Sequence, residues 1–208
     1  MNESPLREDD ATLHAAWRDG DRAAGEELFH RHFNEIFRFF RGKVRHDVND
    51  LVQRTFLGCV ESRDSFRGAS SFRVFLFAIA RHELCNYYRA KRKHELLDFG
   101  VSSLADLAPS PSSQARRLSE KQLIAQALRS LALDLQIALE LHYWEGLRGP
   151  DLAYVLGIPE GTVRSRLRRG LSALRETMNS SSTVPLGESE SELAQWLTER
   201  RPAQQLSG

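Results

Sequence analysis

The stretch Asp151-Leu-Ala-Tyr-Val-Leu-Gly-Ile-Pro-Glu-Gly-Thr-Val-Arg-Ser-Arg-Leu-Arg-Arg-Gly-Leu-Ser-Ala-Leu-Arg175 predicts two helices joined by a tight turn. Leu152 and Leu156 lie one helical turn apart, and Gly157 supplies the permissive backbone that a sharp corner needs. Pro159 fits the first turn of the second helix, where its missing N–H group costs nothing. The stretch therefore predicts a helix–turn–helix.

The second of these helices has an apolar stripe and a basic face. Its apolar residues follow at i, i+4, i+8 and i+11, as Val163, Leu167, Leu171 and Leu174. Five arginines and no acid lie between Gly161 and Arg175. A helix of this kind can enter the major groove of DNA. The alternative is a surface helix with a solvated basic face, but the preceding helix and the Gly-Ile-Pro corner favour DNA.

Composition indicates a folded protein without membrane spans or a disulfide framework. The chain has 208 residues, of which 41% are hydrophobic and 27% are charged. Its two cysteines form no Cys-x-x-Cys pattern, so a reducing compartment is expected. No apolar run approaches the ~18 residues that suggest a membrane span. The polar, acidic N-terminus does not resemble a signal peptide, so we expect a cytoplasmic protein without membrane insertion.

Charge is distributed in blocks that the net charge of +1 hides. Residues 1–27 hold eight acids and three arginines, a net charge of −5. Residues 63–94 hold eight Lys or Arg and two acids, a net charge of +6. Residues 176–208 hold five acids and two arginines, a net charge of −3. The basic block coincides with a segment rich in aromatic residues.

Apolar periodicity predicts three helices in the N-terminal third. A helical pattern over residues 12–29 is interrupted at Asp19-Gly20-Asp21, where a glycine between two aspartates indicates a turn. A second helix has an apolar face that we expect to be buried, made of Phe29, Phe33, Ile36, Phe37 and Phe40. A third begins with acids at residues 47–50 and is expected to direct inward Leu51, Val52, Phe56 and Val60.

Aromatic and basic residues alternate over residues 65–94. The loop Ser65-Phe-Arg-Gly-Ala-Ser-Ser-Phe72 leads into a long helix over residues 73–94, with Tyr87 and Tyr88 near its basic end. Cations that follow phosphates and rings that stack on unpaired bases are typical of single-stranded nucleic-acid binding. The alternative is that the aromatics belong to the core and the Lys/Arg run is a solvated helix end that complements the helix dipole.

The rest of the chain completes a two-domain plan. Residues 95–118 hold five serines, two prolines and one glycine with little apolar periodicity, and they predict a flexible linker. Residues 119–178 predict helices that pack behind the helix–turn–helix, and the tail 179–208 includes a short helix with a Trp/Leu patch. Strand patterns and internal repeats are absent. We therefore predict an all-α fold of two small helical domains, with residues 1–94 forming the first.

The common motifs of enzyme classes are missing. The sequence has no Gly-rich phosphate loop, no His-Glu-x-x-His helix, no Gly-x-Ser-x-Gly elbow and no Cys/His set with metal-ligand spacing. The seven histidines are scattered, and His30 and His32 are expected to point to different sides of a helix. We therefore expect no catalytic residues, no metal and no cofactor.

Three separated motifs make the chain resemble the extracytoplasmic-function (ECF) branch of bacterial RNA polymerase sigma factors. They are Asn49-Asp-Leu-Val-Gln-Arg-Thr-Phe56, then Phe66-Arg-Gly-Ala-Ser-Ser-Phe-Arg73 with Ile79-Ala-Arg81, then Gly161-Thr-Val-Arg-Ser-Arg-Leu-Arg-Arg-Gly170. The resemblance covers roughly residues 20–176. It implies a promoter-specificity subunit that binds core RNA polymerase and promoter DNA, both duplex and melted, and that has an anti-sigma partner.

The resemblance also implies three groups of site residues. The polymerase clamp is expected to bind Asp50, Leu51, Gln53 and Arg54, for which an ordinary exposed helix face is the alternative. Unpaired bases of the minus-ten element are expected at Phe66, Arg67, Ser70, Ser71, Phe72, Arg73, Arg81, Tyr87, Tyr88, Arg89, Lys91 and Arg92. The duplex minus-thirty-five element is expected at His142, Thr162, Arg164, Ser165, Arg168 and Arg169.

The chain departs from the family pattern at several positions. Phe75 and Phe77 stand where tryptophan and tyrosine are common, and His142 stands where an arginine often contacts DNA. The rival function is a conventional helix–turn–helix regulator that binds duplex operators without polymerase. Dependence on core polymerase separates the two functions.

Overall fold

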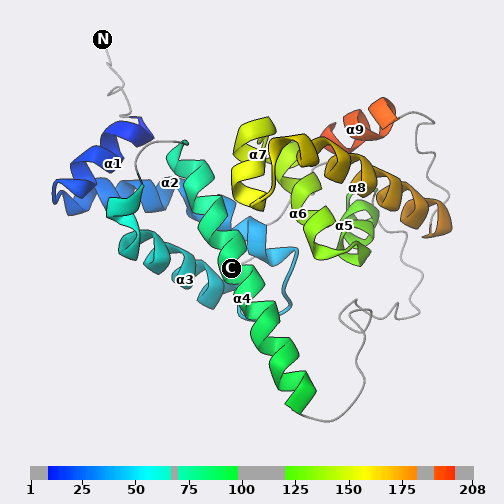
Figure 1. Cartoon of the computed structure of the whole chain (residues 1–208), viewed down its shortest axis with the longest axis horizontal. Coiled ribbons are helices and arrows are strands. Elements are labelled where there is room, and N and C mark those ends of the chain that lie inside the picture. Colours follow the sequence, from blue (N-terminus) through cyan, green and yellow to red (C-terminus); the bar gives the residue numbers. More distant parts are fainter. Residues whose placement is uncertain (1–8, 67–69, 98–119, 182–189, 200–208) are drawn as a thin grey trace. The chain divides into compact units, whose positions relative to one another are not determined.

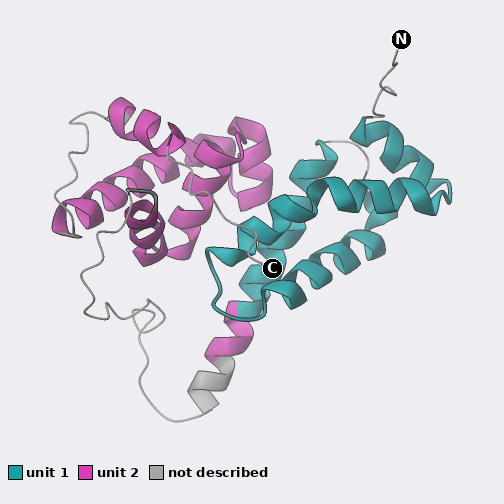
Figure 2. Ribbon diagram, turned by 180° about the vertical axis from the view of Figure 1, so that it is seen from behind, with its two compact units in different colours: residues 1–87 teal, residues 88–208 magenta. Residues whose placement is uncertain are grey.

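The computed structural model describes residues 9–66, 70–97, 120–181 and 190–199, most of which are helical (Figure 1). These ranges contain no β-strand, which confirms the predicted all-α class. The chain divides into two compact units, residues 1–87 and residues 88–208 (Figure 2). Almost all of the predicted linker lies outside the described residues.

The described residues of unit 1 form α1 (Asp10–Arg18), α2 (Arg22–Arg41), α3 (Val48–Glu61), the short 3-10 helix η1 (Arg63–Ser65) and the first part of α4 (Phe72–Leu97). Helix α4 continues past the end of unit 1 at residue 87, so its basic end falls in unit 2. Asp9 and Asp21 cap α1 and α2 by accepting hydrogen bonds from backbone N–H groups in the first turns. The predicted turn at residues 19–21 is confirmed, with Gly20 at a φ of 108°. The two patterns predicted on either side of Phe29 belong to one unbroken helix, α2.

The core of unit 1 differs in part from the predicted one. Fully buried side chains come from α2, α3 and α4, and they include Leu28, Ile36, Phe40, Leu51 and Phe77. Two apolar residues that we expected inside are instead exposed, because each helix buries the adjacent line of its surface. Phe33 is 44% exposed, because α2 buries the line through His32, Ile36 and Phe39. Val60 is 46% exposed, because α3 buries the line through Leu51, Thr55 and Cys59.

Unit 2 is arranged around its longest helix, α8. Its elements are α5 (Glu120–Ser130), α6 (Leu133–Leu139), the π-helical segment η3 (Glu140–Trp144), α7 (Gly149–Leu156), α8 (Glu160–Ser181) and α9 (Glu190–Glu199). Helices α5, α6, α7 and α9 all contact α8. A Cβ atom on Gly170 would lie 3.0 Å from Leu139 Cγ, so this glycine lets α8 approach α6 closely.

The C-terminal helix α9 belongs to the hydrophobic core of unit 2. Leu193 and Leu197 are 0% and 1% exposed and join a buried cluster with residues of α5, α6 and α8. Trp144 Nε1 of η3 donates a hydrogen bond to the Leu197 carbonyl oxygen at 3.0 Å. The Trp/Leu patch of the tail therefore packs on its own unit.

Candidate nucleic-acid interface

The predicted helix–turn–helix is formed by α7 and α8. Gly157 takes the left-handed conformation, with a φ of 62°, and ends α7. The N–H groups of Gly157 and Ile158 reach back to the carbonyls of Tyr154 and Ala153, which closes the helix as a Schellman motif does. Pro159 lies one residue before α8 rather than in its first turn, and its carbonyl accepts from Thr162. The corner is thus set by local chemistry.

The two faces of α8 are separated as the sequence predicts. Val163, Leu171 and Leu174 are 5%, 5% and 0% exposed, and Leu167 is packed against the same core. The predicted duplex-contacting residues Arg164, Ser165, Arg168 and Arg169 are all exposed, and Thr162 is half-buried. Helix α8 therefore presents cations on one side and is held by apolar packing on the other.

Arg166, which is not among the predicted contacts, lies on the inner side of α8. Its side chain is 16% exposed, and its Nη1 atom lies 3.5 Å from Asp134 Oδ2 of α6. This arginine ties α8 to α6. Arg166 therefore differs from Arg164, Arg168 and Arg169, which are exposed, because it contributes to packing inside unit 2.

His142 is held inside the π-helical segment. Its Nδ1 atom is 2.8 Å from the Leu147 carbonyl oxygen, which can only accept, so Nδ1 carries the proton. The ring also packs edge-on to Tyr143 at 4.7 Å. The half-buried imidazole has a fixed orientation, with Nε2 left for any further contact.

The α3 face predicted to bind polymerase includes one residue that is not accessible. Asp50, Gln53 and Arg54 are exposed, and Arg54 Nε lies 2.9 Å from Asp50 Oδ2. Leu51 is 0% exposed, because the line through Leu51 and Thr55 faces the core of unit 1. The expectation that Leu51 contacts a partner directly is therefore wrong. Leu57, 55% exposed, lies one turn after Gln53 on the outer face.

The aromatic residues predicted to stack on unpaired bases are largely core residues. Phe66 and Phe72 are 8% and 2% exposed, so neither can stack on a base in this arrangement. Their rings pack on Phe75, at 4.8 Å and 6.5 Å between centroids. The reason is that α1 covers this cluster with His14, which the sequence pattern of the loop cannot reveal. Arg67 lies outside the described residues.

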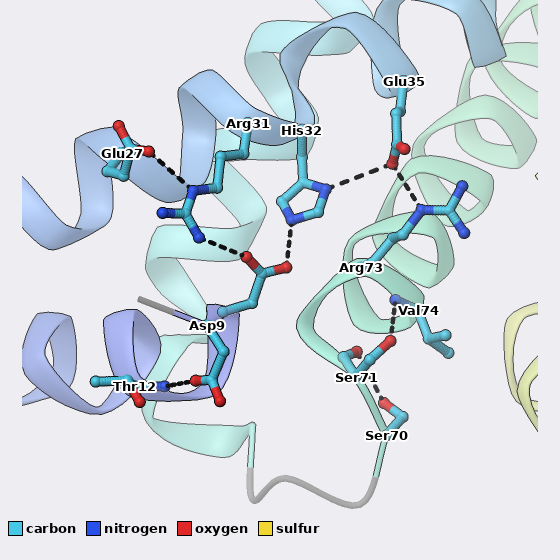
Figure 3. A network of polar contacts seen from close by, with 11 residues as sticks. Asp9, Thr12, Glu27, Arg31, His32, Glu35, Ser70, Ser71, Arg73 and Val74 are labelled. Atoms are coloured by element: carbon cyan, nitrogen blue, oxygen red, sulfur yellow. Dashed lines mark hydrogen bonds and ion pairs between the residues drawn. The ribbon is translucent and has the colours of Figure 1, made fainter. Parts of the chain in front are cut away.

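The start of α4 is fixed by hydrogen bonds on its polar side (Figure 3). Ser71 Oγ accepts from the Val74 N–H group at 3.3 Å and so caps the helix, and Ser70 Oγ donates to the Ser71 carbonyl. Arg73 Nε donates to Glu35 Oε2 of α2 at 2.7 Å, and its guanidinium lies 5.1 Å from the Phe77 ring centroid. Arg73 is therefore oriented by the protein itself.

The basic half of α4 begins at Tyr87. Tyr87 OH donates a hydrogen bond to Asp47 Oδ2 at 3.3 Å. The pKa of the Tyr87 phenol is raised, mainly by burial and to a lesser extent by the negative charge of Asp47. Asp47 has a φ of 66°, which is uncommon for a residue with a side chain. Of the remaining predicted minus-ten contacts, Arg89 and Arg92 are exposed, whereas the half-buried ones are Arg81, Tyr88 and Lys91.

Several polar residues of unit 1 were not found by sequence reasoning. His14 and His32 are 5% and 7% exposed, while His30 is exposed, as predicted for opposite sides of α2. His32 lies 2.7 Å from Asp10 and 3.4 Å from Glu35 (Figure 3). No sequence signal singles these residues out, because the partners of His32 lie on two different helices.

The described ranges show neither a membrane-spanning helix nor a metal-binding group. None of their helices combines the length and the apolar character needed to cross a bilayer. Within the same ranges, no three His, Cys, Asp or Glu side chains are grouped so that they could hold a metal ion.

Comparison with known proteins assigns the chain to a family. Residues 28–94 match Sigma-70 region 2, and residues 121–174 match Sigma-70, region 4. Over 162 residues the chain is 30% identical to the ECF RNA polymerase sigma-E factor of Haemophilus influenzae, which covers 73% of this chain and 86% of that protein. The chain belongs to the ECF family of RNA polymerase sigma factors. As an ECF sigma factor, it directs RNA polymerase to promoters in transcription initiation.

Solved structures of similar sigma factors support the assignment. The structure of CnrH in complex with the cytosolic domain of CnrY is 26% identical to this ECF sigma factor, with a TM-score of 0.61, and the match covers 83% of this chain and 99% of that one. RpoE from Bartonella quintana, solved with the anti-sigma factor NepR, is also 26% identical, with a TM-score of 0.58 and coverage of 76% and 98%. The predicted family and function are confirmed.

Proposed function

We propose that this ECF sigma factor divides promoter recognition between its two units. Unit 2 reads the duplex minus-thirty-five element with the exposed face of α8, and unit 1, together with the rest of α4, holds polymerase and the melted minus-ten strand. The observation that carries the proposal is the α8 face, where Arg164, Arg168 and Arg169 are exposed over a buried apolar stripe. The guanidinium group of arginine can donate hydrogen bonds to the major-groove edge of guanine and to phosphate oxygens.

For the melted strand, the proposal relies on residues at both ends of α4. Ser70, Ser71 and Arg73 form the polar start of the helix, and Tyr87 and Tyr88 lie at its basic half. Opening DNA costs roughly 1.4 kcal/mol per base-pair step. A base stacked on an aromatic ring returns ~1–3 kcal/mol, so a few captured bases hold a short bubble. The chain needs no catalytic residue or cofactor for this.

Core polymerase binds the outer face of α3 in this proposal. Asp50, Gln53 and Arg54 share that face, and Leu57 extends it by one turn. Because Leu51 is buried, it supports the helix from below. We propose a cytoplasmic location for the protein, because core polymerase acts in the cytoplasm.

An anti-sigma protein is the proposed regulator of the chain. The basis is that similar RpoE was solved with the anti-sigma factor NepR. The test is to copurify proteins with the chain from its own cells and to add each one to a transcription reaction. A specific binder should suppress transcription by this sigma factor and leave transcription by an unrelated sigma factor unchanged.

Reconstituted transcription tests the proposed function. The chain is mixed with bacterial core polymerase, binding sites are selected from a randomised duplex library, and the selected DNA is used for run-off transcription. Initiation should require both the chain and core polymerase, and Arg54→Glu should weaken core binding. Arg22→Glu, an exposed change on α2, is the matched control. Tight sequence-specific binding by the chain alone, without initiation when core is added, would instead support the conventional regulator.

A further inference from the structure

Two aromatic residues of unit 1 lock the end of η1 to the start of α4. Phe66 follows η1 directly and Phe72 is the first residue of α4. Their ring centroids lie 6.2 Å apart in an edge-to-face arrangement, and both rings are buried. The separation and tilt of these two rings therefore set the position from which α4 begins.

His14 of α1 contacts both rings. Its centroid lies 4.7 Å from that of Phe66, at an interplanar angle of 85°, and 5.8 Å from that of Phe72. Trp17, one turn further along α1, packs against His14 at 6.0 Å and against Phe29 at 5.3 Å. Helix α1 thus closes the aromatic cluster with two of its own rings.

A second connection joins α1 to the start of α4. Asp10 lies 2.7 Å from His32 Nε2, and His32 Nδ1 lies 3.4 Å from Glu35, which accepts from Arg73 at 2.7 Å. The His32 ring also lies 5.7 Å from Phe72. Figure 3 shows this chain of contacts running from α1 across α2 to α4. Residues 70–73 are therefore held from α1 both by packing and by polar contacts.

The buried imidazole of His14 carries a polar atom without a partner. His14 is 5% exposed, and no residue of the described ranges hydrogen-bonds its Nε2 atom. Burial lowers the pKa of His14, and the cations of Arg18 on α1 and Arg63 on η1 lower it further, against a hydrogen bond with the Arg63 backbone and the carboxylate of Asp64. The ring is therefore neutral at neutral pH, and protonation would place a positive charge inside a cluster of aromatic rings, close to the cations of Arg18 and Arg63.

We infer that His14 is a positioning residue for promoter melting: its ring holds Phe66 against Phe72 and so fixes Ser70, Ser71 and Arg73 for the separated strand. The inference rests on the proposed role of unit 1. His14 acts through the start of α4 and does not touch DNA itself. Protonation or truncation of the ring loosens that start while α8 continues to read duplex DNA.

Three variants test the inference in the full chain with core polymerase, on the promoter selected from the randomised library. His14→Ala removes the ring, His14→Phe keeps a ring but cannot be protonated, and His30→Ala changes an exposed histidine as the control. Opening is measured by permanganate reactivity of promoter thymines, and duplex binding by filter retention. We expect His14→Ala to reduce opening about tenfold with duplex binding nearly unchanged, and His14→Phe to restore opening.

A pH series gives a readout that a merely structural role would not move. Because the pKa of His14 is lowered, opening by the wild type should decline as pH falls below the ordinary 6.5. The His14→Phe chain should lose less activity over the same range. If circular dichroism shows that His14→Ala does not fold, the comparison between wild type and His14→Phe decides.

Opening by His14→Ala at the wild-type level, or a pH profile of His14→Phe that matches the wild type, would overturn the inference while leaving the proposed function intact. Equal loss of opening in a folded His14→Ala and in His14→Phe would overturn it as well. Absence of transcription by the wild type with core polymerase is a failure of the proposed function itself.

Discussion

Arg73 Nε lies 2.7 Å from Glu35 Oε2 and joins the first turn of α4 to the middle of α2. Burial alone raises the pKa of Glu35, but hydrogen bonds from His32 and Arg73 more than offset it and hold the pKa at about 2. Glu35 is therefore ionised throughout the physiological range. Arg73 is consequently placed over the Phe77 ring before any DNA arrives.

Replacing Glu35 tests how much this carboxylate stabilises unit 1. Because the pKa of Glu35 falls from the ordinary 4.5 to about 2, its contribution to the free energy of unfolding is full above pH 4.5 and is lost as the pH falls through 2. Glu35→Gln should lower the free energy of unfolding at pH 7 by roughly 2–3 kcal/mol, and the difference from wild type should shrink between these two pH values. Urea denaturation over a pH series measures it.

Glu27→Gln is the control for this prediction. Glu27 also pairs with an arginine, Arg31 at 2.8 Å, but its side chain is 48% exposed. Exposed pairs contribute at most about 1 kcal/mol. Equal destabilisation by the two changes would contradict the role given to Glu35.

His32 gives the opposite dependence on pH. Burial lowers its pKa, but the hydrogen bonds that His32 donates to Glu35 and Asp10 outweigh burial and raise the pKa above the ordinary 6.5. The raised pKa means that His32 contributes fully to the free energy of unfolding below pH 6.5, and that this contribution is lost as the pH rises through the folded-state pKa. His32→Gln should flatten the alkaline decline of the unfolding free energy. An NMR titration that places the pKa of His32 below 6.5 would refute this prediction.

Helix α9 should stabilise unit 2 through its leucines. Leu197 is 1% exposed within the core cluster, so Leu197→Ala removes buried apolar volume. We expect a loss of about 2–5 kcal/mol in the free energy of unfolding of unit 2, measured by urea denaturation of the full chain. Gln195→Ala, an exposed change on the same helix, should change it by less than about 0.5 kcal/mol. Similar effects of both changes would show that α9 is not part of the core.

Substitutions of the α8 arginines should have different effects, depending on the side of the helix on which each arginine lies. Arg169→Ala should weaken binding of the full chain with core polymerase to its promoter and reduce the salt slope by about 0.9 if Arg169 neutralises one phosphate. Arg166→Ala should lower stability instead, because Arg166 pairs with Asp134 inside unit 2. Binding isotherms at several salt concentrations measure the slope, and an unchanged slope for Arg169→Ala would remove this residue from the DNA surface.

Local sequence patterns predicted the helix–turn–helix well, whereas contacts between residues far apart in the sequence could not be predicted. Gly157 and the Val163–Leu174 stripe act within one or two turns, so the sequence carries them directly. The burial of Phe66 and Phe72 depends on α1, which is about fifty residues earlier in the chain. The Glu35–Arg73 pair likewise joins residues that lie 38 positions apart.

Helices with apolar residues on more than one face were also ambiguous. Helix α2 has phenylalanines around much of its surface, and periodicity alone does not say which of them will face the core. Tertiary packing decides the matter: Phe39 is buried and lies edge-on to Phe77 of α4 at 5.8 Å, whereas Phe33 is exposed. Sequence therefore predicted the helices better than it predicted their inner faces.

The hydrogen bond from Trp144 to the Leu197 carbonyl gives unit 2 a natural optical probe. Two of the three tryptophans of the chain, Trp144 and Trp196, belong to the cluster that receives α9, and the third is Trp17. Release of α9 would expose both indoles to water and break the bond of one of them. Intrinsic fluorescence can therefore follow the docking of this helix in the unlabelled, wild-type protein.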